Sequence, residues 1–174
     1  MLQRIRQFFI AVVAKINDAD RLFIKKHLIK SEQSLFFAMS IPEQRHALNV
    51  TYTALKMAEV EKNINIDKLI KCTLLHDVGK KAGDISTTDK VITVLADRFL
   101  SNWAKRWGKL GRGDKVSNLR HAFYIYYHHA QYSAEKLIQI GDNEIAEIVG
   151  KHHEAPAAND APELRLLRKA DALN

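Results

Sequence analysis

The chain carries a histidine and an aspartate side by side in Leu75-His76-Asp77-Val78-Gly79-Lys80, at the end of an apolar run. An imidazole and a carboxylate this close together can bind one divalent cation, and the second carboxylate oxygen can reach another cation. Cations held in this way activate water and stabilise the charge that develops on phosphorus. The first hypothesis from this pair is therefore metal-assisted phosphate chemistry.

The composition is typical of one folded domain. The 174 residues are 47% hydrophobic and contain only seven Gly and three Pro, which argues against disorder. The single cysteine, Cys72, lies in the apolar run 69–75, so we expect a small buried hydrophobe and not a reactive thiol. No disulfide can form within one chain, which fits a reducing cytoplasm. We expect a cytoplasmic protein.

Apolar residues recur at helical spacing nearly throughout, and no segment alternates convincingly as a strand does. Ser40 and Glu43 have capping-box spacing and begin a helix near residue 41. Gly79 is a natural residue to end a helix in the left-handed conformation. Gly141 ends a later helix, and Asp142 can cap the helix that follows it. The pattern predicts helices over about 41–62, 66–79, 89–107, 117–140 and 143–152, and a last helix from Pro162 to the end of the chain. The expected fold class is all-α, a helical bundle.

The predicted helix faces select further polar residues. On the first long helix, His46 precedes Val50 by four and borders the buried stripe. On the last helix, Leu164, Leu167 and Asp171 are spaced by three and four, so the carboxylate points along the apolar face. A buried carboxylate becomes neutral or finds a cation, which makes Asp171 a ligand candidate. A salt bridge near the chain end is the alternative for Asp171.

The histidine pairs 128–129 and 152–153 can be placed on helix faces in the same way. His129 lies at the edge of the inward face of its helix, whereas His128 points nearly opposite. His152 extends the apolar row of its helix, and His153 follows Val149 by four, so both can face inward. Of the eight histidines, His27 and His121 look incidental to an internal site.

The amino-terminal region is predicted as an addition to this domain. Residues 1–39 are expected to form a helical extension that packs on the core, with residues 40–174 as the domain proper. The first helix of this extension would present an apolar stripe formed by Ile5, Phe9, Val12, Val13 and Ile16. The apolar stretch 8–14 is too short for a transmembrane segment, and no cleavage site of a signal peptide follows it.

The net charge of +7 is concentrated in residues 1–30 and 98–120. Solvated helix faces are the favoured interpretation of these basic segments, and a surface for phosphate-bearing ligands, nucleic acid or anionic lipid is the alternative. Nucleic acid is the less favoured partner, because no nucleic-acid-binding motif accompanies the charges.

The ordered set His46, His76-Asp77, His129, His152-His153 and Asp171 resembles the motif of the HD-domain superfamily of metal-dependent phosphohydrolases, over about residues 40–174. The segment HDVGK is similar to the HDIG variant of its signature. This resemblance implies an all-α bundle with a central metal site. It also implies that His46, His76, Asp77 and Asp171 bind one metal, and that Asp77 bridges to a second metal held by His129, His152 and His153.

The resemblance further implies roles for Asp77 and Lys80 in catalysis, with Lys80 contacting substrate phosphate. Glu154-Ala155-Pro156 stands where the GYP signature of related phosphodiesterases would lie, which argues against cyclic-di-GMP as substrate. His and Asp ligands suit one or two ions of Mn, Fe, Co, Ni or Zn, and Mg also fits. The number of metals and the oligomeric state stay open.

The function expected from these residues is hydrolysis of a phosphomonoester or phosphodiester, in a nucleotide or related small molecule, by a metal-activated water. One alternative is a metal-binding module that senses a ligand or serves as a scaffold, with the basic segments as its binding surface. A bundle with purely structural histidines is a third interpretation.

Overall fold

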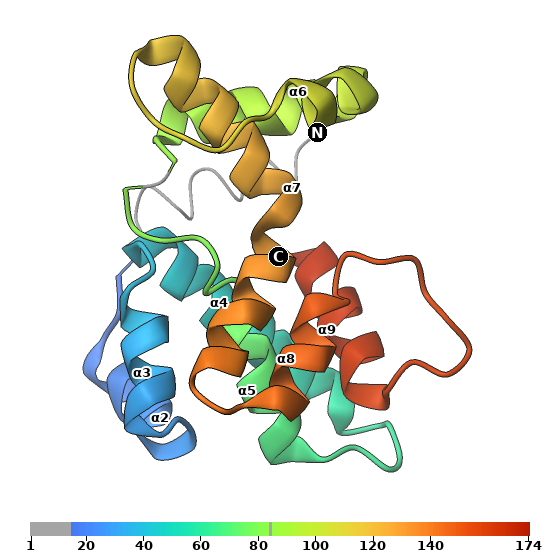
Figure 1. Ribbon diagram of the computed structural model, residues 1–174. Coiled ribbons are helices and arrows are strands. Elements are labelled where there is room, and N and C mark those ends of the chain that lie inside the picture. Colours follow the sequence, from blue (N-terminus) through green and yellow to red (C-terminus); the bar gives the residue numbers. More distant parts are fainter. Residues whose placement is uncertain (1–14, 84) are drawn as a thin grey trace.

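The arrangement of the helices follows from where the chain places its apolar residues. We analysed a computed structural model that describes residues 15–83 and 85–174, and within these ranges the regular structure is helical, with no strand. The predicted all-α class is confirmed. The helices are α2 (Asp18–His27), α3 (Lys30–Phe37), α4 (Ile41–Ala58), α5 (Ile66–Leu75), α6 (Thr87–Trp107), α7 (Lys115–Gln139), α8 (Asn143–Gly150) and α9 (Pro162–Leu173) (Figure 1).

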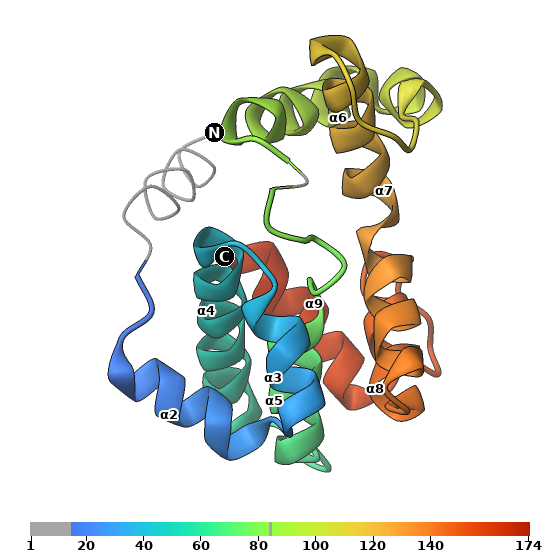
Figure 2. The same cartoon turned by 60° about the vertical axis from the view of Figure 1, so that its left-hand side comes forward.

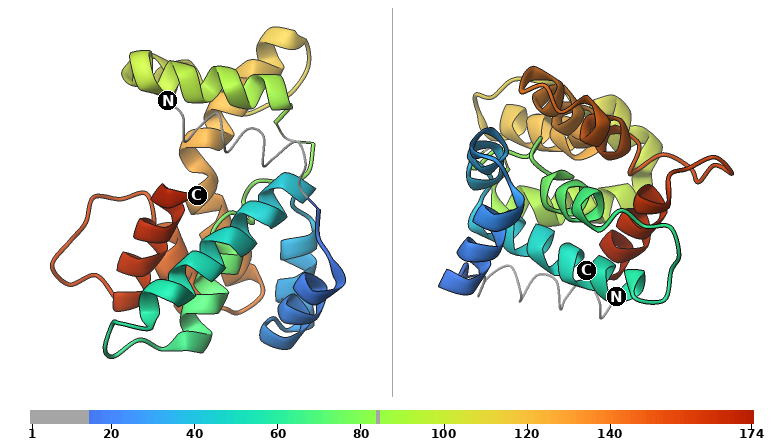
Figure 3. Two further views of the ribbon diagram at one scale, coloured as in Figure 1. Left: turned by 180° about the vertical axis from the view of Figure 1, so that it is seen from behind. Right: turned by 90° about the horizontal axis from the view of Figure 1, so that it is seen from below.

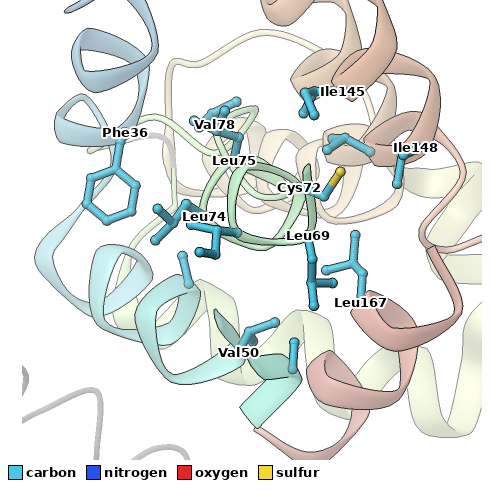
Figure 4. Close-up of a cluster of buried hydrophobic side chains, with 14 of the residues drawn as sticks. Phe36, Val50, Leu69, Cys72, Leu74, Leu75, Val78, Ile145, Ile148 and Leu167 are labelled. Carbon is cyan, nitrogen blue, oxygen red and sulfur yellow. The ribbon is translucent and has the colours of Figure 1, made fainter. Parts of the chain in front are cut away.

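Helix α5 lies at the centre of the bundle because it is apolar on nearly every side. Between residues 69 and 79 only Lys71 is not fully buried, and a helix of this kind must be surrounded by other helices. Figure 4 shows Val50 of α4, Ile148 of α8 and Leu167 of α9 packed around it. Cys72 is fully buried there, and burial raises the pKa of its thiol, as expected for a structural cysteine.

Helix α7 is long enough to leave the core. Its carboxyl-terminal half packs against α8, and its amino-terminal half extends beyond the other core helices and packs against α6 (Figure 2). Two tyrosines fasten this pair, because the hydroxyls of Tyr126 and Tyr127 donate to the carboxylate of Asp97 at 3.0 and 2.8 Å. The α6–α7 pair therefore forms a layer of its own at one end of the molecule (Figure 3).

Helices α2 and α3 contribute to the same core as the rest of the chain, through Ile24, Leu28 and Phe36. A buried ion pair between Asp20 and Arg45 fastens α2 to α4, and Arg45 also donates to the backbone carbonyl of Lys15 at 2.9 Å. The amphipathic stripe predicted for the first helix lies outside the described residues except for Ile16, which is partly buried against the core. The boundary at residue 40 stays a prediction.

Some predicted helix ends were wrong, although the order of the helices was right. Helix α4 ends at Ala58 and not near residue 62, and Asn63 in the connection has a φ of 63°. Helix α5 ends at Leu75, so His76 to Gly79 form a turn, and Gly79 is not left-handed. Gly141 follows the end of α7, as predicted, and its φ is 85°.

Two predicted caps also differ. The Ser40 hydroxyl donates to the Glu43 carboxylate and makes no cap hydrogen bond to the backbone. Asp142 stands at the N-cap of α8, but its side chain likewise makes no cap hydrogen bond. In both cases a neighbouring carboxylate competes for the side chain: Glu43 pairs with Ser40, and Glu32 lies beside Asp142.

The apolar residues of α6 are mainly on the surface. Val91, Leu95, Phe99 and Trp103 are exposed, and Val94 is half-buried. They lie outside because α6 packs mainly against α7 among the described helices and buries Thr93 and Ala104. Within residues 15–83 and 85–174, no helix has the length and apolar character needed to cross a membrane.

A buried carboxyl pair joins α3 to α8. Glu32 is 1% exposed; its carboxylate accepts from the Ile29 backbone N–H at 2.8 Å and from the Lys71 ammonium at 2.6 Å. Burial and the adjacent Glu32 carboxylate raise the pKa of Asp142. A raised carboxyl pKa stabilises the fold below the usual pKa of a carboxyl group, and this stabilisation is lost as the pH rises through the folded-state value.

We therefore expect Asp142→Asn to raise the melting temperature at neutral pH by a few degrees, because a neutral amide replaces a carboxylate that faces Glu32. The gain should shrink as the pH is lowered towards the range where Asp142 is protonated. Thermal unfolding of the variant and of the unchanged protein across this range measures the difference.

The matched control is Asp18→Asn, at an exposed aspartate in the first turn of α2. It should give no pH-dependent gain. An Asp142→Asn variant that is less stable than the unchanged protein at neutral pH would contradict the claim that the Asp142 carboxylate is destabilised by Glu32.

Candidate metal centre

Seven side chains from α4, the end of α5, α7, the end of α8 and α9 meet in one cluster. Three overlapping groups in it bring their ligand atoms within 4.8 Å of one another. These groups are His46, His76 and Asp171; His129, His152 and His153; and His76, Asp77 and His152. The structure thus brings together every residue that the sequence predicted as a metal ligand, and their metal-binding role stays a prediction.

The first group is built around the Asp171 carboxylate. Its Oδ1 lies 3.0 Å from His46 Nε2 and 3.8 Å from His76 Nε2. The Oδ2 atom of Asp77 faces the same two rings, at 3.8 Å from His46 Nε2 and 3.4 Å from His76 Nε2. Two imidazoles and two carboxylates therefore converge, which is a donor set suited to a divalent transition metal.

The second group lies on the other side of Asp77. The Nε2 atoms of His129 and His153 are 2.8 Å apart, and the rings of His152 and His153 are 4.0 Å apart between centroids. Asp77 Oδ1 lies 3.3 Å from His129 Nε2. Because Oδ1 faces one group and Oδ2 faces the other, Asp77 is the side chain placed to contact a cation in each.

Three of the rings are held by backbone carbonyls one turn earlier. The Nδ1 atoms of His76, His129 and His152 lie 2.8, 2.7 and 2.6 Å from the carbonyl oxygens of Thr73, Tyr126 and Val149. A carbonyl oxygen only accepts, so Nδ1–H is the donor and Nε2 of the neutral ring carries the lone pair. The Nε2 atoms of His76 and His152 are buried and have no hydrogen-bond partner in the described residues. This orientation is what a histidine needs to bind a metal.

The protonation states also fit a cation site. Burial, with Lys80 and the other histidines nearby, holds the pKa of His129 well below its usual value, and burial beside His76 lowers the pKa of His152 to about 3. Burial also lowers the pKa of His153. These rings are neutral near pH 7, as metal ligands must be.

The carboxylates are ionised despite their burial. Burial alone would raise the pKa of Asp77, but Lys80 and His76 hold it well below its usual value. Burial would likewise raise the pKa of Asp171, but the hydrogen bond with His46 lowers it. Burial opposes protonation of His76, yet Asp77 and Asp171 raise its pKa. Two negative charges thus face the space between the rings.

Lys80 compensates part of this charge. Its ammonium lies 2.8 Å from both oxygens of Asp77, and burial, which would lower its pKa, is outweighed by Asp77, which raises it. The Lys80 side chain retains 16% exposure, so this residue lies between the cluster and solvent.

Gly79 lets α7 approach the His76-Asp77 turn. A Cβ at this position would lie 2.3 Å from the backbone oxygen of His129 and 2.8 Å from the backbone nitrogen of Ser133. The Gly79 N–H donates to the Ser133 hydroxyl at 2.8 Å. Ser133 was not among the predicted site residues, although Ser133 follows His129 by four residues and thus lies on the same face of α7.

Arg168 was also missed, and it fixes the loop that carries the second histidine pair. Its guanidinium donates to the Lys151 backbone carbonyl at 2.7 Å and pairs with Asp160, whose carboxylate accepts from the Ala157 N–H at 2.8 Å. Arg168 precedes Asp171 by three residues on α9, so one helix positions ligands of both groups. Arg168 and residue 151 are too far apart in the sequence for this hydrogen bond to be predicted from spacing.

The remaining histidines lie outside the cluster. His128 stacks on Tyr124 with ring centroids 4.3 Å apart, as expected for the ring that points away. His27 lies 3.9 Å from Asp67 at the other side of α5. His121 is buried and its Nδ1 accepts from the Gly111 N–H at 3.4 Å, so it helps to hold the 108–114 loop.

Comparison with known proteins agrees with this geometry. A family model described as HD domain matches residues 44–174, which is most of the chain and contains all seven clustered side chains. No curated protein and no solved structure matches the chain significantly.

Gly79→Ala should lower the free energy of unfolding by about 2 kcal/mol or more, because the added methyl group meets backbone atoms that cannot move aside alone. Chemical denaturation measures the loss. Gly113→Ala is the matched control, since its Cβ would meet its nearest neighbour at 3.6 Å, an ordinary contact. Equal stability of the two variants would contradict the close approach of α7 at Gly79.

Proposed function

Because the chain belongs to the HD-domain family, we propose that it is a metal-dependent phosphohydrolase that acts on a nucleotide or a related small phosphoester. The family is one of metal-dependent phosphohydrolases, and the clustered His and Asp side chains of this chain could hold divalent cations. The catalytic activity, its substrate class and the roles of individual residues are the proposed part.

The observation that carries the proposal is the pair of buried Nε2 atoms of His76 and His152, neither of which has a hydrogen-bond partner among the described residues. Both rings are locked by Nδ1–H donation to a carbonyl, and both belong to one group with the Asp77 carboxylate. A buried acceptor without a partner is costly, and a purely structural histidine would be expected to use both nitrogens. A cation between the rings satisfies these atoms.

Bound cations would lower the pKa of a coordinated water and neutralise charge developing on phosphorus. The side chains would divide the remaining tasks. Asp77 would hold both cations through its two oxygens, with His46, His76 and Asp171 on one side and His129, His152 and His153 on the other. The carbonyls of Thr73, Tyr126 and Val149 would keep three rings in the ligating tautomer.

Lys80 would bind the substrate phosphate. In the described structure its ammonium balances Asp77, and a cation at Asp77 would take over that role. A lysine released from a carboxylate beside the site is a point charge suited to a phosphate oxygen. His153 is the exposed member of its group, so the approach from solvent lies on its side of the cluster.

We propose to test this with the purified full chain loaded separately with Mn, Fe(II), Co, Ni, Zn or Mg. The substrates are nucleoside mono-, di- and triphosphates, cyclic dinucleotides and a model phosphodiester. We expect metal-dependent hydrolysis that chelation abolishes. Asp77→Asn should lower kcat/KM by about a hundredfold or more, because it removes the shared ligand.

Asp67→Asn is the matched control, at a carboxylate whose side chain is 87% exposed in the first turn of α5, and it should retain full activity. His153→Asn, at an exposed position, gives a second variant that tests the site if Asp77→Asn fails to fold. Metal bound at the cluster without hydrolysis of any substrate would favour a sensing or scaffold module instead. Absence of bound metal would favour structural histidines.

A further inference from the structure

Helix α6 presents an apolar row to solvent, formed by Val91, Leu95 and Phe99 at intervals of four residues, with exposed fractions of 42, 53 and 73%. Residues at this spacing lie on one face of a helix. The row ends at a kink, because the backbone of Leu100 is not helical (φ −143°, ψ 36°), and Trp103, which is 50% exposed, lies beyond the kink. Half of the large hydrophobic side chains that are exposed in the described residues lie between positions 91 and 116: these four together with Ile92, Leu100, Leu110 and Val116.

These exposed side chains do not belong to the hydrophobic core. Helix α6 uses mainly another face against α7, where Ala104 is buried and Asp97 accepts from two tyrosine hydroxyls, and beyond the kink Trp103 packs edge-on against Phe123 of α7. Figures 1 and 3 show α6 at the end of the molecule, with α7 between it and the core helices. A concentrated apolar surface in this position indicates a site of association.

Positive charge follows the row along the chain. Residues 98–120 contain seven Lys or Arg against the single acid Asp114, a difference of +6. Among them, Lys105, Arg106, Lys109, Arg112 and Lys115 are exposed. Exposed Leu, Phe and Trp side chains next to Lys and Arg are typical of helices that lie in the interface of an anionic membrane.

We propose that α6 and the following basic segment dock on an anionic lipid surface, with the row entering the interface and the charges meeting lipid headgroups. Nucleic acid would satisfy the charges but leave the aliphatic side chains in water. A second copy joined through the same face would cover the row but set +6 against +6. An anionic bilayer satisfies both parts of the surface. This inference does not rest on the proposed enzymatic function.

The test is co-sedimentation of the full chain with vesicles of phosphatidylcholine alone or mixed with phosphatidylserine. We expect binding to the mixed vesicles, weakened by salt because exposed charges are screened. Leu95→Gln combined with Phe99→Gln should weaken binding about tenfold or more, since both side chains would lose their burial. Lys105→Gln, Arg106→Gln and Lys109→Gln together should weaken it by a similar factor.

Two matched controls change the same residue types elsewhere on the surface. Leu22→Gln with Val60→Gln removes two hydrophobic side chains that are 68 and 87% exposed. Lys25→Gln, Lys26→Gln and Lys30→Gln together remove three exposed charges on α2 and α3. Both controls should bind vesicles as the unchanged protein does.

Several outcomes would overturn the proposal. One is no binding to the mixed vesicles, or equal binding to neutral and mixed vesicles. Another is a loss that the control variants reproduce. Self-association in solution that Leu95→Gln with Phe99→Gln abolishes, without vesicle binding, would assign the row to a second copy. Binding of an oligonucleotide that only the charge variant weakens, again without vesicle binding, would assign the segment to nucleic acid.

Discussion

The buried negative charge of Asp77 is the constraint on which the rest of the site depends. Its side chain is 2% exposed, and the cost of removing a carboxylate from water must be offset by cations or donors placed around it. The structure supplies the Lys80 ammonium at 2.8 Å, and the Nε2 atoms of His76 and His129 face the carboxylate at 3.4 and 3.3 Å, where a bound cation would lie between them and Asp77. Each of these partners requires a particular element at a particular place.

The fold places these groups next to the Asp77 carboxylate. Helix α5 is apolar nearly all round, so it lies in the centre and carries the His76-Asp77 turn into the interior. Gly79 admits the backbone of α7 next to this turn, which brings His129 against Asp77. Helix α9 then supplies Asp171 and, through Arg168, orders the loop that follows His153. Local apolar packing and polar contacts between distant segments thus position the same few side chains around Asp77.

Much of this arrangement is predictable from the sequence. Helical periodicity is local, so the order of the helices, the end of α7 before Gly141 and the inward choice of His129 over His128 all follow from spacing. Asp171 could be selected because a carboxylate in line with Leu164 and Leu167 points along an apolar face. The resemblance to the family supplied the grouping of the ligands, which spacing alone leaves open.

Other features depend on contacts between segments that are distant in the sequence. A glycine at the end of a helix usually predicts a left-handed turn, but Gly79 is required by the approach of His129 and Ser133, fifty or more residues later. The Ser40 and Asp142 caps were lost to neighbouring carboxylates. The exposure of the α6 row follows from the tertiary position of α6, and periodicity cannot distinguish a face that meets the core from one that meets a partner.

The central claim is that Asp77 joins two cation sites, and anomalous scattering from crystals of the manganese- or zinc-loaded protein tests it most directly. The account predicts two peaks about 3.5–4 Å apart, both within bonding distance of Asp77. One peak should also contact His46, His76 and Asp171, and the other should contact His129, His152 and His153. A single peak, or peaks that do not contact Asp77, would contradict it.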